Sequence, residues 1–416
     1  MRVLFVTHYF HPEVGAPQTR ILEAAALLRE RGHQVTVLTG FPNYPDGIIP
    51  PPYRRRLFMR ERLDDMGIDV VRSAVYPAPN RGFARRLVNH ASFALSSVLA
   101  APFAGRVDAV IAETPPLFTA VAAVPIALMH RAPLVLNVAD LWPESAVQLG
   151  LLSNRAAIKG AELLERFSYA RAKAITVPTP GMRSILVSRG QPADKVVLLR
   201  NAVDVDRFAI APAGGGHGPR RVLYCGTVGL AQGVGTLVEA SRRLKEAGDP
   251  VEVVIAGDGA ERSQLERRAS ELGLEHVRFA GRVARDRIPD LIASADITVM
   301  SLRDVPLFQD AVPTKLLEYM AAAKPVVAAA GGQVAEVMRQ SGAGIACPPE
   351  DPAAMAEAIR TLVADTERAR AMGLEGRRYV EQHLSRRAFV AQLEQVLESL
   401  VSPDGDAARA RRGRVT

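Results

Sequence analysis

Short apolar runs that alternate with long helical patterns constrain the fold of this chain most strongly. In the first half, β-branched runs lie at residues 3–7, 34–39, 108–113, 132–138, 173–178 and 195–200. Helical patterns such as the one over residues 19–31 lie between them, which is typical of a parallel sheet covered on both faces. The pattern restarts with runs at 221–226, 252–257, 276–281, 296–301 and 325–330. The sequence therefore predicts an α/β chain with two doubly wound, Rossmann-like parallel-sheet domains.

The predicted domain boundaries follow from composition. We expect a first domain over residues 1–208 and a second over 220–384, joined by a glycine- and proline-rich linker at 209–219. A helix at 385–402 can return to the first domain, and the small, basic tail at 403–416 is expected to be disordered. Ligands of doubly wound sheets bind beyond the carboxyl ends of the strands, so the predicted site is a central cleft that the two domains face.

Composition places the chain among soluble globular proteins. Its 416 residues are 48% apolar and 23% charged, and two cysteines are too few for a disulfide framework. The N-terminus is too short and too abruptly polar for a signal peptide. We expect no apolar run to reach the roughly 18 to 20 residues of a spanning helix. The expected location is the cytoplasm.

The net charge of +8 favours anionic partners. Nucleic acid is not predicted, because the arginines do not alternate with aromatic residues and no helix-turn-helix or zinc-finger spacing occurs. Arg81, Arg85 and Arg86 precede a mostly apolar helix that extends to residue 105. A basic end followed by an apolar helix suits an anionic membrane surface, and it equally suits a buried domain helix.

Glu318 is the most informative single residue. It stands among Leu316, Leu317, Tyr319, Met320 and three alanines, where an unpaired carboxylate is costly. Two partners are open: Lys315 one turn earlier, or the hydroxyl pair of a bound ribose.

Other motifs each have a structural and a functional interpretation. Gly226 and Gly229 form a G-x-x-G loop that suits either a phosphate or a plain strand-to-helix turn. His8, His11 and Glu13 share one loop, but three possible ligands without a fourth do not predict a metal site. We interpret the D-V-D sequence of residues 204–206 as structural.

Eight segments, in this order and at these spacings, resemble the family 4 retaining glycosyltransferases with the GT-B fold. Within that family, the chain is most similar to bacterial transferases that build O-antigen, capsule or exopolysaccharide, including amino-sugar transferases. The segments are HYFHPEVGAPQTR near the start, FPNYPDG (41–47), TPPLF (114–118), DLWPESAVQLG (140–150), RNAVDVDRF (200–208), YCGTVGLAQGVGTLVEA (224–240), IAGDGAE (255–261) and PTKLLEYMAAAKPVVAAAGGQVAEV (313–337).

The resemblance implies roles on the donor side. Glu318 would hold the donor ribose, and Asp310 would lie near the hydroxyls of the transferred sugar, although a solvated loop aspartate remains an alternative for Asp310. Thr227 and Gln232 stand where many members carry an arginine and a lysine that clamp the diphosphate. Lys315 is the candidate for the missing positive charge.

The remaining implied contacts complete the predicted site. Arg282 and Val283 would bracket the nucleobase, beside the phosphate loop of Gly226 and Gly229. Gly15 would lie under the leaving diphosphate. Asp140 and Glu144 would orient the donor sugar or the acceptor hydroxyl, although a loop with a helix N-cap explains them equally well. The acceptor-side residues would be His8, His11 and Trp142.

The implied reaction is retaining transfer from a nucleotide-diphosphate sugar to a glycan or polyprenyl-linked acceptor. The donor is expected to be UDP-linked, with an N-acetylamino sugar and a GDP-linked donor both left open. No metal and no cofactor besides the donor are expected, and no protein nucleophile is required. Two alternatives are a sugar-nucleotide epimerase of the same fold and a non-catalytic, two-lobed binding protein.

Overall fold

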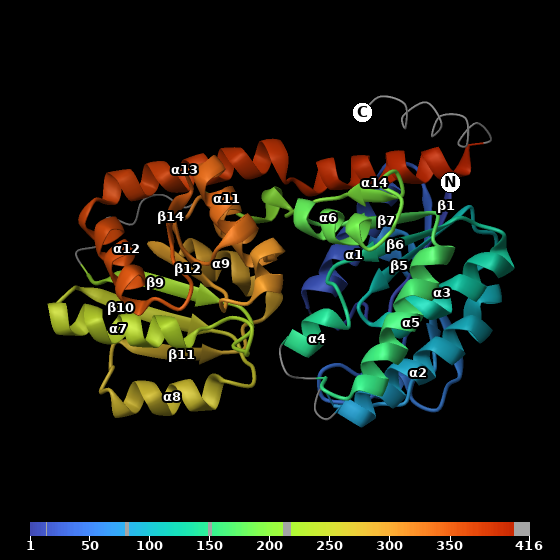
Figure 1. Ribbon diagram of the computed structural model, residues 1–416, viewed down its shortest axis with the longest axis horizontal. Coiled ribbons are helices and arrows are strands. Elements are labelled where there is room, and N and C mark those ends of the chain that lie inside the picture. Colours follow the sequence, from blue (N-terminus) through green and yellow to red (C-terminus); the bar gives the residue numbers. More distant parts are fainter. Residues whose placement is uncertain (14, 80–82, 149–151, 211–217, 403–416) are drawn as a thin grey trace. The chain divides into compact units, whose positions relative to one another are not determined.

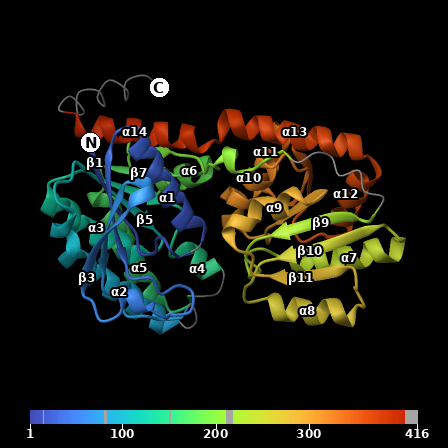
Figure 2. The same ribbon diagram turned by 180° about the vertical axis from the view of Figure 1, so that it is seen from behind.

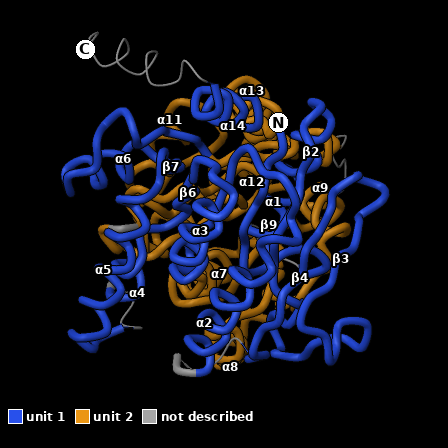
Figure 3. The backbone as a smooth tube through the Cα atoms, turned by 90° about the vertical axis from the view of Figure 1, so that its right-hand side faces the viewer, with its two compact units in different colours: residues 1–200, 389–416 blue, residues 201–388 orange. Residues whose placement is uncertain are grey.

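Two α/β units make up the chain. The computed structural model describes residues 1–13, 15–79, 83–148, 152–210 and 218–402. One unit comprises Met1–Arg200 and Phe389–Thr416, and the other comprises Asn201–Ala388 (Figure 3). Each unit contains a sheet with helices on both faces, so the predicted fold class of two doubly wound parallel-sheet domains is confirmed (Figure 1).

The first unit is built on an eight-stranded sheet in the order β3-β4-β2-β1-β5-β6-β7-β8. Its strands are β1 (Arg2–Val6), β2 (Gln34–Gly40), β3 (Phe58–Leu63), β4 (Ile68–Ser73), β5 (Ala109–Thr114), β6 (Leu134–Val138), β7 (Ala174–Val177) and β8 (Val196–Leu198). All neighbours pair in parallel except β3, which runs antiparallel to β4 at the edge. The strand order reverses between β1 and β5, so the loops after these two strands flank the switch point.

Helices cover both faces of this sheet. They are α1 (Ala16–Glu30), α2 (Phe83–Ala100), α3 (Leu117–His130), α4 (Glu144–Gln148), α5 (Arg155–Arg171), α6 (Pro180–Ser188) and α14 (Arg386–Val401), with 3₁₀ helices η1 (Pro51–Tyr53), η2 (Asp64–Met66) and η3 (Ala101–Ala104). Helix α2 packs on β2, β4 and α3. Helix α14 begins in the second unit and joins the first from Phe389 onward. There Glu394 accepts a 2.6 Å hydrogen bond from His33 and pairs with Arg31.

The second unit has six parallel strands in the order β11-β10-β9-β12-β13-β14, the doubly wound order 3-2-1-4-5-6. They are β9 (Arg220–Cys225), β10 (Val251–Ala256), β11 (Val277–Gly281), β12 (Ile297–Ser301), β13 (Val326–Ala329) and β14 (Gly344–Cys347). The helices are α7 (Gly235–Ala247), α8 (Arg262–Glu271), α9 (Ile288–Ala293), α10 (Thr314–Ala321), α11 (Gly332–Ser341), α12 (Pro352–Ala364) and α13 (Thr366–His383), with η4 (Val205–Arg207), η5 (Arg285–Arg287) and η6 (Pro306–Asp310).

Two separate apolar cores follow from strand alternation in this unit. Leu223 faces the cluster that α9, α10, α11 and α13 complete, whereas Val222 and Tyr224 face the cluster of α7, α8 and α12. Helices accordingly lie on both sides of the sheet in the two opposite views (Figures 1 and 2). The strand order reverses between β9 and β12, which makes the loops after these strands the expected ligand-binding edge.

The structure corrects the predicted boundary at residue 208. The units divide after Arg200, because Val203, Val205 and Phe208 are buried in the core of the second unit. Strands β3, β4 and β14 were not predicted. β3 carries three consecutive charged residues, Arg60, Glu61 and Arg62, which leave no continuous apolar run. Most of the predicted linker (211–217) and the predicted disordered tail (403–416) lie outside the described residues.

The expectation that no apolar segment reaches spanning length is wrong. Residues Arg85–Ala104 form one helical segment of 20 residues with a mean hydropathy of 1.3, which is long and apolar enough to cross a membrane by length and composition. The 3₁₀ turn η3 extends α2 and gives this length. Only 28% of the segment is buried, on a face that includes Asn89, Phe93 and Ser97.

Candidate active site

The carboxyl ends of three neighbouring strands in the second unit are joined through glycine loops. The Gly226 N–H donates to the Ala256 carbonyl at 2.9 Å, and the Gly257 N–H donates to the Gly281 carbonyl at 2.7 Å. A Cβ atom on Gly257 would lie 1.7 Å from the Gly226 oxygen, and one on Gly259 would lie 2.2 Å from the Val228 oxygen. Only glycine permits this approach of backbone to backbone, so these residues form a fixed floor at the ligand-binding edge.

The predicted phosphate loop lies at the switch point of this sheet. The Gln232 carbonyl accepts a 2.7 Å hydrogen bond from the Ser301 hydroxyl at the end of β12. The Gln232 side chain lies beside Gly229, whose added Cβ would be 3.1 Å from its Oε1. Thr227 is exposed, and its carbonyl accepts from the Tyr224 hydroxyl at 2.6 Å. The structure therefore brings the loop residues together around the reversal in strand order.

Lys315 lies directly beside this loop. Its Nζ donates to the Tyr224 hydroxyl at 2.5 Å and lies 4.2 Å from the centroid of the Tyr224 ring. A Cβ on Gly226, whose φ is 153°, would be 2.9 Å from Nζ. Gly226 thus leaves room for the lysine. The Gly226 N–H already donates to the Ala256 carbonyl. A phosphate at this loop would therefore have to accept from other donors.

Burial lowers the pKa of the Lys315 ammonium from 10.5 to about 8, against the opposing effects of the Cys225 and Glu318 charges. A cation that is already desolvated next to a loop gains more from an incoming anion than an exposed cation does. The position and pKa of Lys315 suit an anion-binding group whose charge titrates near neutral pH.

The buried Tyr319 hydroxyl holds the end of β9 in place. The Tyr319 hydroxyl accepts from the Cys225 N–H at 2.8 Å and donates to the Cys225 carbonyl at 3.1 Å. Burial raises the pKa of the Cys225 thiol to about 11, so this group is a protonated, weak nucleophile at neutral pH. Tyr224 and Tyr319 were not predicted as site residues. Tyr319 is part of the apolar pattern of α10, which gave no sign of its bond to a distant strand.

Glu318 is partly exposed on α10, one turn after Lys315. Its negative charge raises the Lys315 pKa, in opposition to burial. The interpretation in which Lys315 partners Glu318 thus has electrostatic support. The predicted ribose contact is a separate role of the same carboxylate, and it stays a prediction.

Asp310 ends the 3₁₀ helix η6, and burial raises the pKa of its carboxyl above the usual 3.8. The segment is fixed against α11, because a Cβ on Gly332, with φ 56°, would lie 1.8 Å from the Gln309 carbonyl oxygen. Asn201 Nδ2 donates to the Val312 carbonyl at 3.2 Å just before α10. The chain around Asp310 is therefore anchored on both sides, and the predicted contact of Asp310 with the transferred sugar stays a prediction.

The predicted nucleobase residues follow the edge strand β11. The Arg282 guanidinium lies 3.3 Å from the Asp258 carboxylate, and Val283 packs against the core that contains α10. Asp258 belongs to the loop after β10, so this ion pair links two loops of the same edge. The pair leaves Arg282 largely exposed.

In the first unit, His8 follows β1 and is buried. One ring nitrogen, Nε2, lies 2.7 Å from the Asn89 Oδ1, whereas Nδ1 has no hydrogen-bond partner within the described ranges. Burial, the charge of His90 and the opposing bond to Asn89 together lower the His8 pKa to about 3. A neutral, enclosed imidazole packs the switch point of the first sheet. An acceptor contact of His8 remains a prediction.

The rest of this loop is held by Glu13, which sequence reasoning treated only as a possible ligand. Its Oε1 accepts from the N–H groups of Asn43 and Tyr44, both at 2.7 Å. The His11 carbonyl accepts a hydrogen bond from buried Arg72 at 2.6 Å. His11 itself is exposed. Gly15 precedes α1, where a Cβ would lie 2.4 Å from the Gln18 Oε1.

Asp140, Trp142 and Glu144 follow β6. Burial raises the pKa of Asp140, although the Ser145 hydroxyl and the Leu141 N–H donate to its carboxylate. Glu144 opens α4 and pairs with Arg189. These local bonds match the structural interpretation as a capped turn, and the predicted orienting roles stay untested. Trp142 is half-buried.

A buried acid that sequence reasoning missed lies in the same region. Glu165 of α5 is 7% exposed, and burial raises its pKa although Tyr169 donates to it. The charges of Arg189 and Glu144 also act on Glu165. Its place in an amphipathic helical pattern gave no signal. Within the described residues, no group of three or more histidine, cysteine, aspartate or glutamate side chains is arranged to hold a metal ion.

Known families match the two halves of the chain. Residues 208–379 match the family described as glycosyl transferases group 1, and residues 15–202 match the glycosyl transferase 4-like domain. The chain is 26% identical over 382 residues to a putative colanic acid biosynthesis glycosyl transferase of Escherichia coli, covering 86% of this chain and 91% of that protein.

A second relative and a solved structure extend these matches. A GDP-mannose-dependent alpha-(1-6)-phosphatidylinositol monomannoside mannosyltransferase of Mycobacterium tuberculosis is 27% identical over 275 residues, covering 59% of this chain and 71% of that protein. HepE of Anabaena, solved in complex with UDP-glucose, has a TM-score of 0.72 at 20% identity, over 96% of this chain and 100% of that chain. At this identity the likeness shows the fold.

Proposed function

Since the chain belongs to the family 4 glycosyltransferases with the GT-B fold, we propose that it catalyses retaining transfer of a sugar from a nucleotide-diphosphate donor to a glycan or polyprenyl-linked acceptor. The product would belong to a cell-surface polysaccharide. The proposal of a diphosphate donor rests mainly on the position of Lys315, a desolvated cation beside the glycine loop at the switch point of the second sheet. A UDP-linked donor is favoured by the resemblance to UDP-binding members, and the GDP-mannose-dependent relative keeps GDP open.

In the proposed reaction, the bond between the sugar C1 and the diphosphate oxygen breaks, and a bond from C1 to the acceptor oxygen forms on the same face. The acceptor proton moves to the leaving diphosphate oxygen. Lys315 stabilises the charge that develops on the diphosphate, so the positive charge at this point comes from the protein rather than from a metal ion. The protonated Cys225 thiol supplies no nucleophile, in keeping with a reaction without a covalent enzyme intermediate.

The test is acceptor-dependent release of the nucleoside diphosphate. The purified chain is incubated with labelled UDP- and GDP-sugars, with and without a lipid extract of the cells that produce it. Release and label transfer that both require the extract support the proposal. Conversion of the donor sugar without any extract would instead identify the epimerase alternative, and binding without either change would identify the non-catalytic one.

Donor affinity is expected to depend on pH through Lys315. The ammonium is charged below its pKa of about 8 and neutral above it, so UDP affinity should be steady between about pH 7 and 8 and fall above that range. The decline can approach tenfold per pH unit until the pKa of the complex is reached. Calorimetric titration with UDP at several pH values measures this. The Lys315→Met variant should show no such decline, and an equally steep decline in that variant would exclude Lys315 as its cause.

We propose that the first unit contacts the inner face of the membrane through α2. Its solvent-facing stripe consists of Val88, Leu95 and Leu99, which are 50%, 73% and 68% exposed, and exposed Arg85 and Arg86 lie near its start. An apolar stripe beside arginines suits an anionic bilayer surface. Contact there would bring a lipid-linked acceptor to the enzyme.

Replacing Leu95 and Leu99 together with serine should weaken binding to phosphatidylglycerol vesicles about tenfold or more, because both side chains lose their apolar burial. Co-sedimentation measures the bound fraction. Ile210→Ser, at an exposed apolar residue of the second unit, is the control and should bind as the wild type does. Equal binding by all three proteins would exclude the α2 stripe as the contact.

A further inference from the structure

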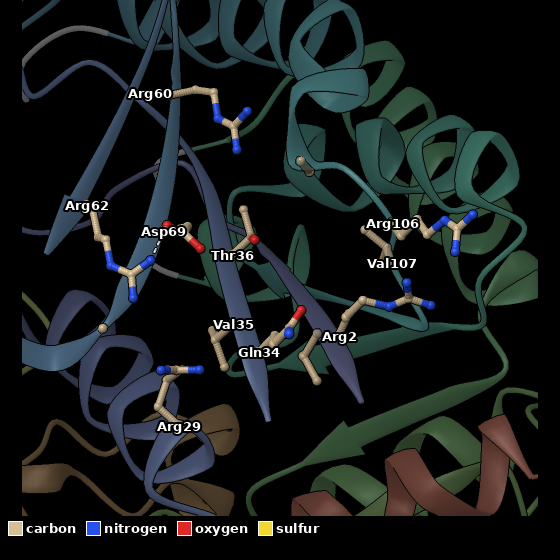
Figure 4. A pocket seen from close by; sticks show the side chains of 13 residues that line it. Arg2, Arg29, Gln34, Val35, Thr36, Arg60, Arg62, Asp69, Arg106 and Val107 are labelled. Carbon is tan, nitrogen blue, oxygen red and sulfur yellow. Dashed lines mark ion pairs between the residues drawn. The ribbon is translucent and has the colours of Figure 1, made fainter. Parts of the chain in front are cut away.

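The first unit contains a polar cavity at the opposite end of its sheet from the loops that follow β1 and β6. It has a volume of about 460 Å³ and lies where β1, β2 and β4 begin (Figure 4). Arg2 and Gln34 are paired first residues of β1 and β2, and Thr36 pairs with Asp69 of β4. Because parallel strands begin at this edge, the cavity is separate from the carboxyl edge where doubly wound sheets bind their usual ligands.

Five arginines line this cavity. They come from separate parts of the unit and surround an open space (Figure 4): Arg2, Arg29, Arg60, Arg62 and Arg106. Asp69 is the one carboxylate in the lining, which leaves a formal charge of +4. We call this set of six residues the basic pocket. Because the arginines outnumber the carboxylates around the cavity, the basic pocket has a positive potential.

Only two of the arginines pair with carboxylates. Arg2 lies 2.5 Å from Asp108, and Arg62 lies 3.5 Å from Asp69 and 3.8 Å from Asp64 at an exposed position. In the part of the chain that the structure describes, no carboxylate lies within 4.0 Å of Arg29, Arg60 or Arg106. Arg29 donates from Nη1 to the His33 carbonyl, and its buried Nε has no partner among the described residues. The pocket therefore offers guanidinium donors that this chain does not use.

We propose that the basic pocket binds a ligand with two phosphate groups. The planar guanidinium fork matches phosphate oxygens with two parallel hydrogen bonds, which makes arginine the preferred residue for phosphate recognition. Arg29, Arg60 and Arg106 have no carboxylate partner among the described residues, and three such guanidinium groups favour an anion that presents more than one phosphate. The cavity volume is within the range of small-ligand sites, about 300–1,000 Å³.

Two sources of such a ligand share this chemistry: a free diphosphate and a lipid headgroup with two phosphates. The rim of the pocket is partly apolar, since Phe58 of β3 and half-exposed Phe103 of η3 lie 5.6 Å apart as a tilted ring pair. These rings precede Arg60 and Ala104, which line the pocket. The phosphate recognition is the same for both sources, and the experiment below separates them.

The test compares a pocket variant, Arg60→Ala/Arg106→Ala, with a control variant, Arg155→Ala/Arg171→Ala. All four arginines are exposed residues of the first unit, so both variants lose the same charge and should keep the fold. Each protein is titrated with inorganic pyrophosphate by calorimetry. It is then co-sedimented with phosphatidylcholine vesicles that contain or lack cardiolipin, a lipid with two phosphates.

If the pocket takes a free diphosphate, pyrophosphate affinity should fall about tenfold or more in the pocket variant only. If the pocket takes a headgroup, binding to cardiolipin vesicles should fall by a similar factor in the pocket variant only. Either result supports the site and identifies its source. Identical behaviour of the pocket and control variants toward both probes would overturn the proposal. Pyrophosphate held by the donor loop does not affect the comparison, because both variants retain that loop.

Discussion

The Lys315→Met variant is expected to lose about 100- to 1,000-fold in kcat/KM. Methionine keeps the length of the side chain but removes the positive charge that the structure places beside Gly226. Losing one preorganised group that stabilises developing charge in an active site typically costs this much. Steady-state kinetics with the donor and a lipid-linked acceptor measure the loss.

The same variant should be no less stable than the wild type, which separates a role in the reaction from a role in folding. Burial holds the folded-state pKa of Lys315 at about 8, below the usual 10.5. A base with a depressed pKa destabilises the fold below that pKa, and this penalty disappears as pH rises from 8 toward 10.5. Methionine removes the penalty, so Tm at pH 7 should stay the same or rise. The control Lys245→Met, at an exposed residue of α7, should keep full activity. Loss of activity together with a large fall in Tm would contradict this account.

The Glu318→Ala variant is expected to bind UDP about 10- to 100-fold more weakly. A carboxylate that accepts from the ribose hydroxyls makes charge-assisted hydrogen bonds, and we expect their loss to cost about 1.5–3 kcal/mol in total. Calorimetric titration measures the loss. Glu336→Ala, which removes an exposed carboxylate from α11 in the same unit, is the control and should bind UDP normally.

Titrating the wild type and the Glu318→Ala variant with both UDP and 2′-deoxy-UDP distinguishes the ribose contact from an effect through Lys315. The wild type should bind the deoxy analogue more weakly than UDP, and the Glu318→Ala variant should bind the two ligands equally. If Glu318 acts only by raising the Lys315 pKa, both proteins would show the same preference between the two ligands. That outcome would reject the ribose role.

Five of the six strands of the second unit, β9 to β13, could be predicted from sequence within one or two residues, whereas β14 was missed. β9, β10 and β12 are continuous apolar runs that are buried on both faces, and each predicted run overlaps the observed strand almost completely. β3 was missed because Arg60 and Arg62 alternate with less exposed residues in an antiparallel edge strand. The boundary at Arg200 was missed because the residues after it contribute to a core formed by distant segments.

The site residues that could be predicted from sequence are those that belong to local motifs. Lys315 could be proposed from sequence because it shares a helix with Glu318 and the neighbouring loop lacks the usual cations. Tyr224 and Asn201 could not, because their roles depend on contacts with Lys315 and Val312, about 90 and 110 residues away. The burial of His8 among Asn89 and aromatic rings could not be predicted either, and its expected acceptor contact stays a prediction. The basic pocket was not predictable, since its five arginines come from separate parts of the unit.

The most direct test of the central claim is calorimetric titration of the wild-type chain with UDP and GDP, with NAD as the control ligand. The account predicts that one nucleoside diphosphate, UDP, binds at a single site that is lost in Glu318→Ala, and that NAD does not bind there. Preferential binding of GDP would keep the mechanism and change the donor class. A folded chain that binds neither UDP nor GDP would contradict the assignment as a nucleotide-sugar-dependent transferase.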